Sequence, residues 1–182
     1  MQKGLILVLL IFVVFSCADL KRKELLTQVE KYQNELNEMS NRLDSLSIND
    51  VSEIKNNTLQ TELHIKQNLK LDTINLVLAQ QLEAFKLMRK SIKPLMQQYS
   101  KAKKGIVEEK QVLKNLHLDI EEDRGERHRY NEYIGFERQK LNQLKSLSTD
   151  YFTARAKFFN DYKLLSPPIE ALALELMKKN NR

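Results

Sequence analysis

Apolar residues recur at alternating spacings of four and three along much of the chain. The first such stripe consists of Leu25, Val29, Tyr32, Leu36, Met39, Leu43 and Leu46. This alternation is typical of helices that pack along a narrow apolar face, as in a coiled coil. It predicts a helix from about residue 19 to 47. Asn49 and Asp50 follow with turn and cap chemistry, so we expect the chain to reverse near residues 48–51.

A second stripe with the same alternation predicts a second long helix. Its members are Leu71, Ile74, Leu78, Gln81, Phe85, Met88, Ile92, Leu95, Tyr99 and Ala102. Less regular apolar positions from Val51 to Leu63 lead into it. Pro94 lies inside the pattern. Because proline removes a helical hydrogen bond, we expect a bend or a local break near residues 92–94.

The segment around Gly105 supports two interpretations. It has lysines before the glycine and acids after it, which suits the end of one helix and the start of another. The apolar phase nevertheless continues through Ile106 to Ile120, which suits one continuous helix. Charge favours a reversal, since it would place the basic segment 86–104 beside the acids at 119–126. We therefore expect a reversal at Gly105, with the continuous helix as the alternative.

A third stripe predicts a helix from about residue 107 to 165. Its members are Tyr130, Ile134, Leu141, Leu144, Tyr151, Phe158, Tyr162 and Leu165. Arg124-Gly125-Glu126 and Gly135 are weak points within it. Ser166-Pro167-Pro168 should end it, because Ser suits a cap and Pro suits the first turn of a new helix. The short last helix would turn four residues inward: Ile169, Leu172, Leu176 and Met177.

These elements predict an all-α protein, an elongated antiparallel helical bundle or coiled-coil hairpin. It would have about three long helices and a short C-terminal helix. Of the 182 residues, 30% are charged and 7% are aromatic, and there are four Gly, three Pro and no Trp. An all-β protein or a glycine-rich nucleotide-binding fold needs more turn residues than this.

The first seventeen residues differ from the rest. Lys3 precedes an apolar run from Leu5 to Phe15. The run is shorter than the roughly 20 residues of a membrane-spanning helix, and it has the length of the hydrophobic part of a signal peptide. Cys17 is the single cysteine and follows almost directly. One cysteine cannot form an internal disulfide, so this position indicates a modification site.

Val14-Phe15-Ser16-Cys17 resembles the lipobox of bacterial lipoproteins. The resemblance implies that residues 1–16 are a cleaved signal peptide and that Cys17 receives a diacylglycerol. Residues 17–182 would then be a lipid-anchored domain of the cell envelope, outside the cytoplasm, and Ala18 favours the periplasmic side of the outer membrane. Several acyl chains hold a protein stably on a membrane. The alternatives are an uncleaved short anchor and cleavage at another site.

No motif with catalytic or metal-binding spacing occurs in the sequence. The four glycines lie far apart, and GxSxG and HExxH are absent. None of His64, His117 and His128 has a Glu three residues before it, as a di-iron bundle requires. We therefore expect no catalytic residue, no metal, no cofactor beyond the covalent lipid on Cys17, and a protein that is not an enzyme.

Two groups of residues are candidates for binding. A basic stretch suits an anionic envelope polymer, and it consists of Lys86, Arg89, Lys90, Lys93, Lys101, Lys103 and Lys104. An aromatic group with an arginine suits a protein interface, and it consists of Tyr151, Phe152, Arg155 and Phe159. For both groups we prefer a structural interpretation. The lysines would pair with the acidic segment, and the aromatic residues would fill the bundle core.

The sequence thus favours a lipid-anchored helical scaffold or adaptor of the cell envelope. It would bind another protein, or associate with itself, through its apolar stripes. The alternative function is binding of cell-wall glycan or anionic polymer through the basic stretch. Nucleic acid is not an expected partner, because the predicted location lies outside the cytoplasm.

Overall fold

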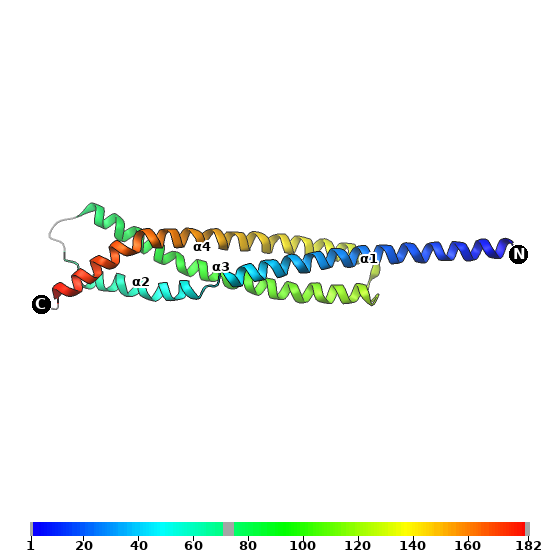
Figure 1. Cartoon of the computed structure of the whole chain (residues 1–182), viewed down its shortest axis with the longest axis horizontal. Coiled ribbons are helices and arrows are strands. Elements are labelled where there is room, and N and C mark those ends of the chain that lie inside the picture. Colours follow the sequence, from blue (N-terminus) through cyan, green and yellow to red (C-terminus); the bar gives the residue numbers. More distant parts are fainter. Residues whose placement is uncertain (1, 71–74, 181–182) are drawn as a thin grey trace. The chain divides into compact units, whose positions relative to one another are not determined.

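The computed structural model describes residues 2–70 and 75–180, and the side chains of residues 20–70 and 75–179. Within these ranges the chain is helical and has no strand, which confirms the all-α fold class (Figure 1). Its elements are α1 (Gln2–Ser45), α2 (Asn49–Asn68), α3 (Leu76–Glu121), the 3-10 turn η1 (Arg127–Arg129) and α4 (Tyr130–Asn180). No helix in the described part of the chain combines the length and the apolar composition that a membrane span requires.

The chain divides into two compact units. Unit 1 consists of Met1–Arg42 and Lys103–Ser146, and unit 2 consists of Leu43–Ala102 and Leu147–Arg182. Unit 1 packs α1, the second part of α3 and the first part of α4. Unit 2 packs α2, the first part of α3 and the second part of α4. Each unit is therefore a helical bundle with its own buried face.

The core of unit 1 follows the predicted apolar stripes. Leu25, Val29, Tyr32 and Leu36 of α1 are buried, as are Leu113 and Ile120 of α3 and Ile134 and Leu141 of α4. Gln33 donates to the Leu113 carbonyl at 3.2 Å. Lys145 of α4 lies 2.5 Å from Glu35 of α1. These contacts connect α1 to both other helices of the unit.

The expected reversal at Gly105 is wrong, and the alternative of a continuous helix is confirmed. Helix α3 runs through Gly105 without interruption, and Ala102 and Ile106 on either side are buried. A Cβ placed on Gly105 would lie 2.6 Å from Cδ2 of Leu144 on α4. The Leu144 side chain thus occupies the space that a side chain at position 105 would need, and the glycine does not end the helix.

The chain instead reverses between α3 and α4, at the weak point noted around Gly125. Asp123 and Gly125 have φ angles of 59° and 73°. The Arg124 amide donates to the Asp119 carbonyl at 2.8 Å, a bond that closes helices whose next residue is left-handed. The hydroxyl of Tyr130 donates to the same carbonyl at 2.8 Å. The first left-handed residue after α3 is Asp123, and the glycine that usually marks such a helix end lies two residues later, at Gly125.

The expected pairing of the basic and acidic segments is also wrong. Three acids near this turn contact arginines of the same turn: Glu122 with Arg124, Asp123 with Arg127, and Glu126 with Arg129. The reason is that the reversal lies next to the acids and not at Gly105. They therefore stabilise the turn locally, each pair contributing little because all are exposed.

In unit 2 the predicted second helix is divided. Helix α2 ends at Asn68 and α3 begins at Leu76. Asn75 caps α3, because its Oδ1 accepts from the Leu78 amide at 3.1 Å. Leu71 and Ile74, which were assigned to the second stripe, lie outside the described residues. The first helix ends at Ser45, close to the predicted position, but the reversal expected near residues 48–51 is wrong. Helix α2 does not fold back along α1, because α1 and α2 each pack antiparallel against α3, and the chain folds back between α2 and α3 instead.

Three prolines lie inside helices. Pro94 does not break α3, and the stop and separate C-terminal helix expected at Pro167 and Pro168 are wrong, since α4 continues to Asn180. All three prolines are exposed, so the carbonyls that lose a helical partner face the solvent side. In Figure 1 the last, red part of α4 departs from the direction of the orange part before it.

Two glycines of unit 1 give a matched test of the packing at Gly105. Gly135 also lies within a helix, but a Cβ there would meet nothing within 4 Å. Gly135→Ala should raise the free energy of unfolding by about 0.5–1 kcal/mol. Gly105→Ala should be less stable than Gly135→Ala by about 1–3 kcal/mol, because Leu144 must move within a packed core. Urea denaturation followed by circular dichroism measures both.

The control combines Gly105→Ala with Leu144→Ala. Truncating the leucine makes room for the new methyl group, so the loss in the double variant should be smaller than the sum of the single losses. Equal stabilisation by alanine at both glycines would contradict the packing of Leu144 against Gly105.

Candidate functional site

Unit 2 contains a groove between α2 and α3 with a volume of about 550 Å³. We call it the basic groove and define it by its lining residues, Lys55, Leu59, Arg89, Lys90, Ile92, Lys93, Met96, Gln97 and Ser100. The positions on α3 recur every three or four residues, which places them along one side of that helix. Lys55 and Leu59 are one turn apart on α2, so they lie on the same side of that helix and line the other side of the groove.

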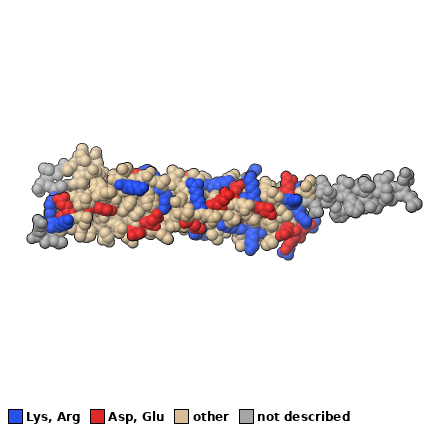
Figure 2. All heavy atoms as spheres, viewed as in Figure 1, with Lys and Arg blue, Asp and Glu red and all other residues tan. Residues whose placement is uncertain are grey.

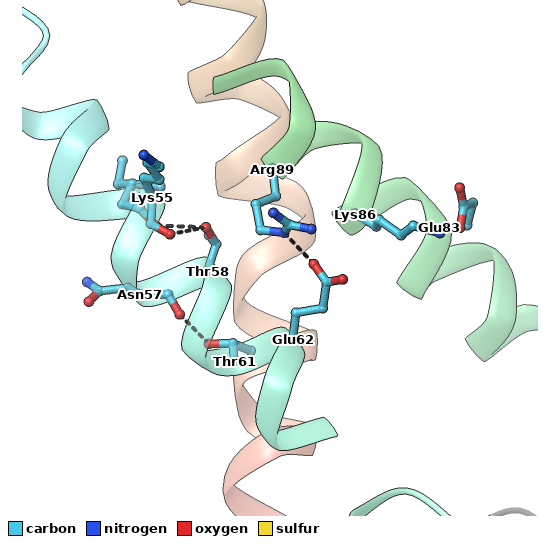
Figure 3. A network of polar contacts seen from close by, with 9 residues as sticks. Lys55, Asn57, Thr58, Thr61, Glu62, Glu83, Lys86 and Arg89 are labelled. Carbon is cyan, nitrogen blue, oxygen red and sulfur yellow. Dashed lines mark hydrogen bonds and ion pairs between the residues drawn. The ribbon is translucent and has the colours of Figure 1, made fainter. Parts of the chain in front are cut away.

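Cations surround the basic groove. Lys55 comes from α2, and Arg89, Lys90 and Lys93 come from α3. Arg89 donates through Nε to Oε2 of Glu62 on α2 (Figure 3), and the two side chains are 23% and 30% exposed. This contact uses one of the five N–H donors of an arginine. Such a partly exposed pair fixes how α2 and α3 align more than it stabilises the unit.

The floor of the basic groove is apolar. Ile92 is buried, Met96 is half-buried, and Leu59 is 38% exposed. Thr58, the residue before Leu59 in α2, is fully buried, and its hydroxyl donates to the Ile54 carbonyl at 2.8 Å. The groove thus combines exposed apolar surface with a positive border.

A second hollow of about 360 Å³ follows the same two helices. Its lining includes Ile65 and Lys66 of α2 and Leu82 of α3. Glu62 belongs to this lining and Arg89 to that of the basic groove, so their ion pair lies where one hollow ends and the other begins. Figure 3 shows Lys86 turned toward Glu83, 3.0 Å away on α3.

The structure separates the seven basic residues selected from the sequence. Arg89, Lys90 and Lys93 line the basic groove, and Lys86 lines the second hollow. The other three do not line the basic groove: exposed Lys101 belongs to unit 2, and Lys103 and Lys104 belong to unit 1. On the face drawn in Figure 2, blue and red side chains are interspersed over the described residues. Charge alone therefore does not mark the groove.

Sequence reasoning missed Lys55, Leu59 and Met96. A single helix from residue 51 to 104 would put Lys55 about 50 Å from Arg89, whereas the break after Asn68 lets α2 fold back along α3. The signal that would have found Lys55 and Leu59 is the cap chemistry of Asn75. Met96 lies on α3 and was missed because it is not a member of the predicted apolar stripe.

The aromatic group selected from the sequence mostly serves the core of unit 2. Tyr151 is fully buried, and its hydroxyl donates to the Leu46 carbonyl at 2.6 Å. Arg155 lies 2.5 Å from Asp50 and 4.5 Å above the Phe159 ring. Half-buried Phe152 lies 5.7 Å from the Tyr151 ring. We call the contacts of Tyr151 and Arg155 the turn latch, because they hold the α1–α2 turn on α4.

Unit 1 contains a pair of carboxyl groups, Glu109 and Glu137, of which Glu109 is buried. Glu109 of α3 is 3% exposed at a position of the apolar stripe, and its Oε1 has no hydrogen-bond partner in the described part of the chain. Burial, a hydrogen bond with Glu137 and the charge of Glu137 raise the Glu109 pKa to about 8, and Lys140 opposes them. Glu109 is therefore mostly protonated in the folded protein at neutral pH.

Two further sequence-based predictions concern lipid attachment at Cys17 and metal binding. The side chain of Cys17 lies outside the described side chains. Among the residues described, no group of three or more His, Cys, Asp or Glu side chains is placed to hold a metal ion. No protein-family model matches the chain, and no match was found among curated proteins or solved structures.

The turn latch gives a test on stability. Tyr151→Phe removes the donor to the Leu46 carbonyl and should lower the free energy of unfolding by about 1–2 kcal/mol. Tyr162→Phe is the control, because it retains the ring that stacks on Phe158 and should change stability by less than about 0.5 kcal/mol. Chemical denaturation compares the two, and an equal effect would remove the role assigned to the Tyr151 hydroxyl.

The carboxyl pair gives a test on pH. The folded-state pKa of Glu109 lies above its ordinary value of 4.5, so folding keeps a proton that the unfolded chain releases. Its contribution to stability is complete below about pH 4.5 and is lost as pH rises to about 8. Glu109→Gln should therefore flatten the decline in melting temperature between these limits, whereas Glu108→Gln, at an exposed neighbour, should leave it unchanged. A wild-type melting temperature that rises over this interval would disprove the assignment.

Proposed function

We propose that this chain is a lipid-anchored, non-enzymatic adaptor of the cell envelope that binds another protein through the basic groove. The observation that carries the proposal is the groove itself, with an apolar floor of Leu59, Ile92 and Met96 and a border of four cations among its described lining. Protein partners bind where apolar side chains are desolvated inside a polar border. The basic groove has this composition.

The membrane part of the proposal rests on the sequence. The apolar run before Cys17 and its lipobox-like ending support export, cleavage and lipid attachment there. Mass spectrometry of the protein recovered from membranes tests this directly. A diacylglycerol-modified residue 17 at the new N-terminus is expected, and an intact segment 1–16 with a free thiol would refute the anchor.

Binding of anionic envelope polymer is the second candidate function. It is favoured by the exposed Lys101, Lys103 and Lys104, which lie on α3 outside the lining of the groove. Polymer binding through these residues should weaken steeply with salt. Replacing all three by Ala should then abolish pull-down with envelope polymer, and unchanged pull-down would exclude this function.

Site-specific crosslinking tests the adaptor function. A photoreactive amino acid at Met96 in the basic groove should capture a discrete protein partner in native membranes. The matched control carries the same group at Leu87, which is 57% exposed and lines a different groove, between α3 and α4. Capture at Met96 should fall about tenfold when Lys90→Glu and Lys93→Glu are introduced. Equal capture at Leu87, or no effect of charge reversal, would contradict binding through the groove.

A further inference from the structure

Unit 2 has two long grooves of nearly equal volume, and their charges differ. The groove between α3 and α4 measures about 540 Å³, and its lining includes Lys157 and Asp161, which pair at 2.6 Å. The basic groove measures about 550 Å³ and has Lys55, Lys90 and Lys93 on its border, with no acid among its described lining residues. Only the basic groove therefore selects a ligand by sign of charge.

The floor restricts the ligand further. A ligand that is charged but has no apolar part would place polar groups over Leu59 and Met96. These groups would find few hydrogen-bond partners, because Gln97 and Ser100 are the only uncharged polar side chains in the described lining. Burying unpaired polar groups is costly. The preferred occupant therefore presents apolar groups to the floor and negatively charged groups to the border, which in a protein are carboxylates.

The secondary structure of the ligand follows from its backbone. An extended peptide would bring a row of N–H and C=O groups onto the apolar floor, where helices α2 and α3 offer no strand edge to pair with. A helix satisfies these groups internally. It also matches the length of the site, because the lining on α3 from Arg89 to Ser100 spans about 16 Å, or three helical turns.

We propose that the basic groove binds an acidic amphipathic helix of the partner protein, which packs as an additional helix against α2 and α3. The apolar face of that helix would lie on Leu59, Ile92 and Met96, with apolar residues recurring every three or four positions. Carboxylates beside this face would meet Lys55, Lys90 and Lys93. Arg89 would stay on Glu62 and mark the end of the binding site, where the second hollow begins. This inference rests on the proposed adaptor function.

Synthetic helical peptides test the proposal with the purified chain. The probe is a peptide of about four turns with a Leu stripe flanked by Glu, and binding is measured by fluorescence anisotropy. Three comparison ligands separate the contributions: the same peptide with Lys in place of Glu, the same peptide with Gln in place of Leu, and polyglutamate. Only the Leu–Glu peptide should bind with measurable affinity.

Variants of the chain locate the binding. Lys90→Glu combined with Lys93→Glu should weaken the Leu–Glu peptide at least about tenfold. Lys114→Glu combined with Lys163→Glu changes net charge equally at exposed positions outside the groove and should weaken it by less than about threefold. Circular dichroism confirms that both variants remain helical.

Several outcomes would overturn the proposal. Equal binding of polyglutamate or of the Gln-substituted peptide would mean that charge alone is recognised. Equal effects of the two double variants would place the binding elsewhere. Binding of dodecyl sulfate below its micellar concentration, without binding of any peptide, would reassign the groove to small anionic amphiphiles.

The same data separate this inference from the adaptor function. Capture of a protein through Met96 without binding of the acidic peptide would leave the adaptor function standing and remove the helical ligand. Binding of the acidic peptide without capture in membranes would support recognition of an acidic helix by the groove and would count against the adaptor function in the envelope.

Discussion

The fold depends on one constraint: the apolar stripe of α3 must stay covered along its whole length. That stripe runs from Phe85 to Ile120 through both units, and most of its residues are buried. In unit 1 the cover comes close enough that Leu144 occupies the space beside Gly105. In unit 2 the cover comes from α2 and α4. Because α2 is only 20 residues long, it covers only part of α3. The basic groove lies between these two helices.

Polar residues occupy several positions of the apolar stripes, and two of them contact a polar residue on a neighbouring helix. Glu109 meets Glu137 in unit 1, and Arg155 meets Asp50 in unit 2. Pairs of this kind contribute little net stability, because burial of a charged or polar group costs as much as the contact returns. Their effect is on alignment, since a slip of one helical turn would separate the partners. The apolar residues thus set which faces are buried, and the polar residues set the register.

The sequence predicted buried faces well and chain reversals poorly, for a physical reason. Burial follows from local periodicity, so Leu25, Val29 and Leu36 could be identified without knowing their neighbours. A reversal depends on what packs against it. Gly105 has the chemistry of a helix end, but Leu144 uses its missing side chain for packing. Of the basic groove, the sequence alone identifies the cations on α3, whereas Lys55 and Leu59 join them only because α2 folds back along α3.

The charge of the basic groove also bears on self-association. An exposed apolar floor normally invites contact between copies of the same chain. Here two copies that met groove to groove would bring Lys55, Lys90 and Lys93 of each into opposition, and like charges across an interface are unfavourable. The cations would therefore disfavour contact between two copies through this groove and favour the proposed ligand of opposite charge. Repulsion of this kind can contribute as much to specificity as attraction does, and it favours the proposed adaptor role over self-association through this groove.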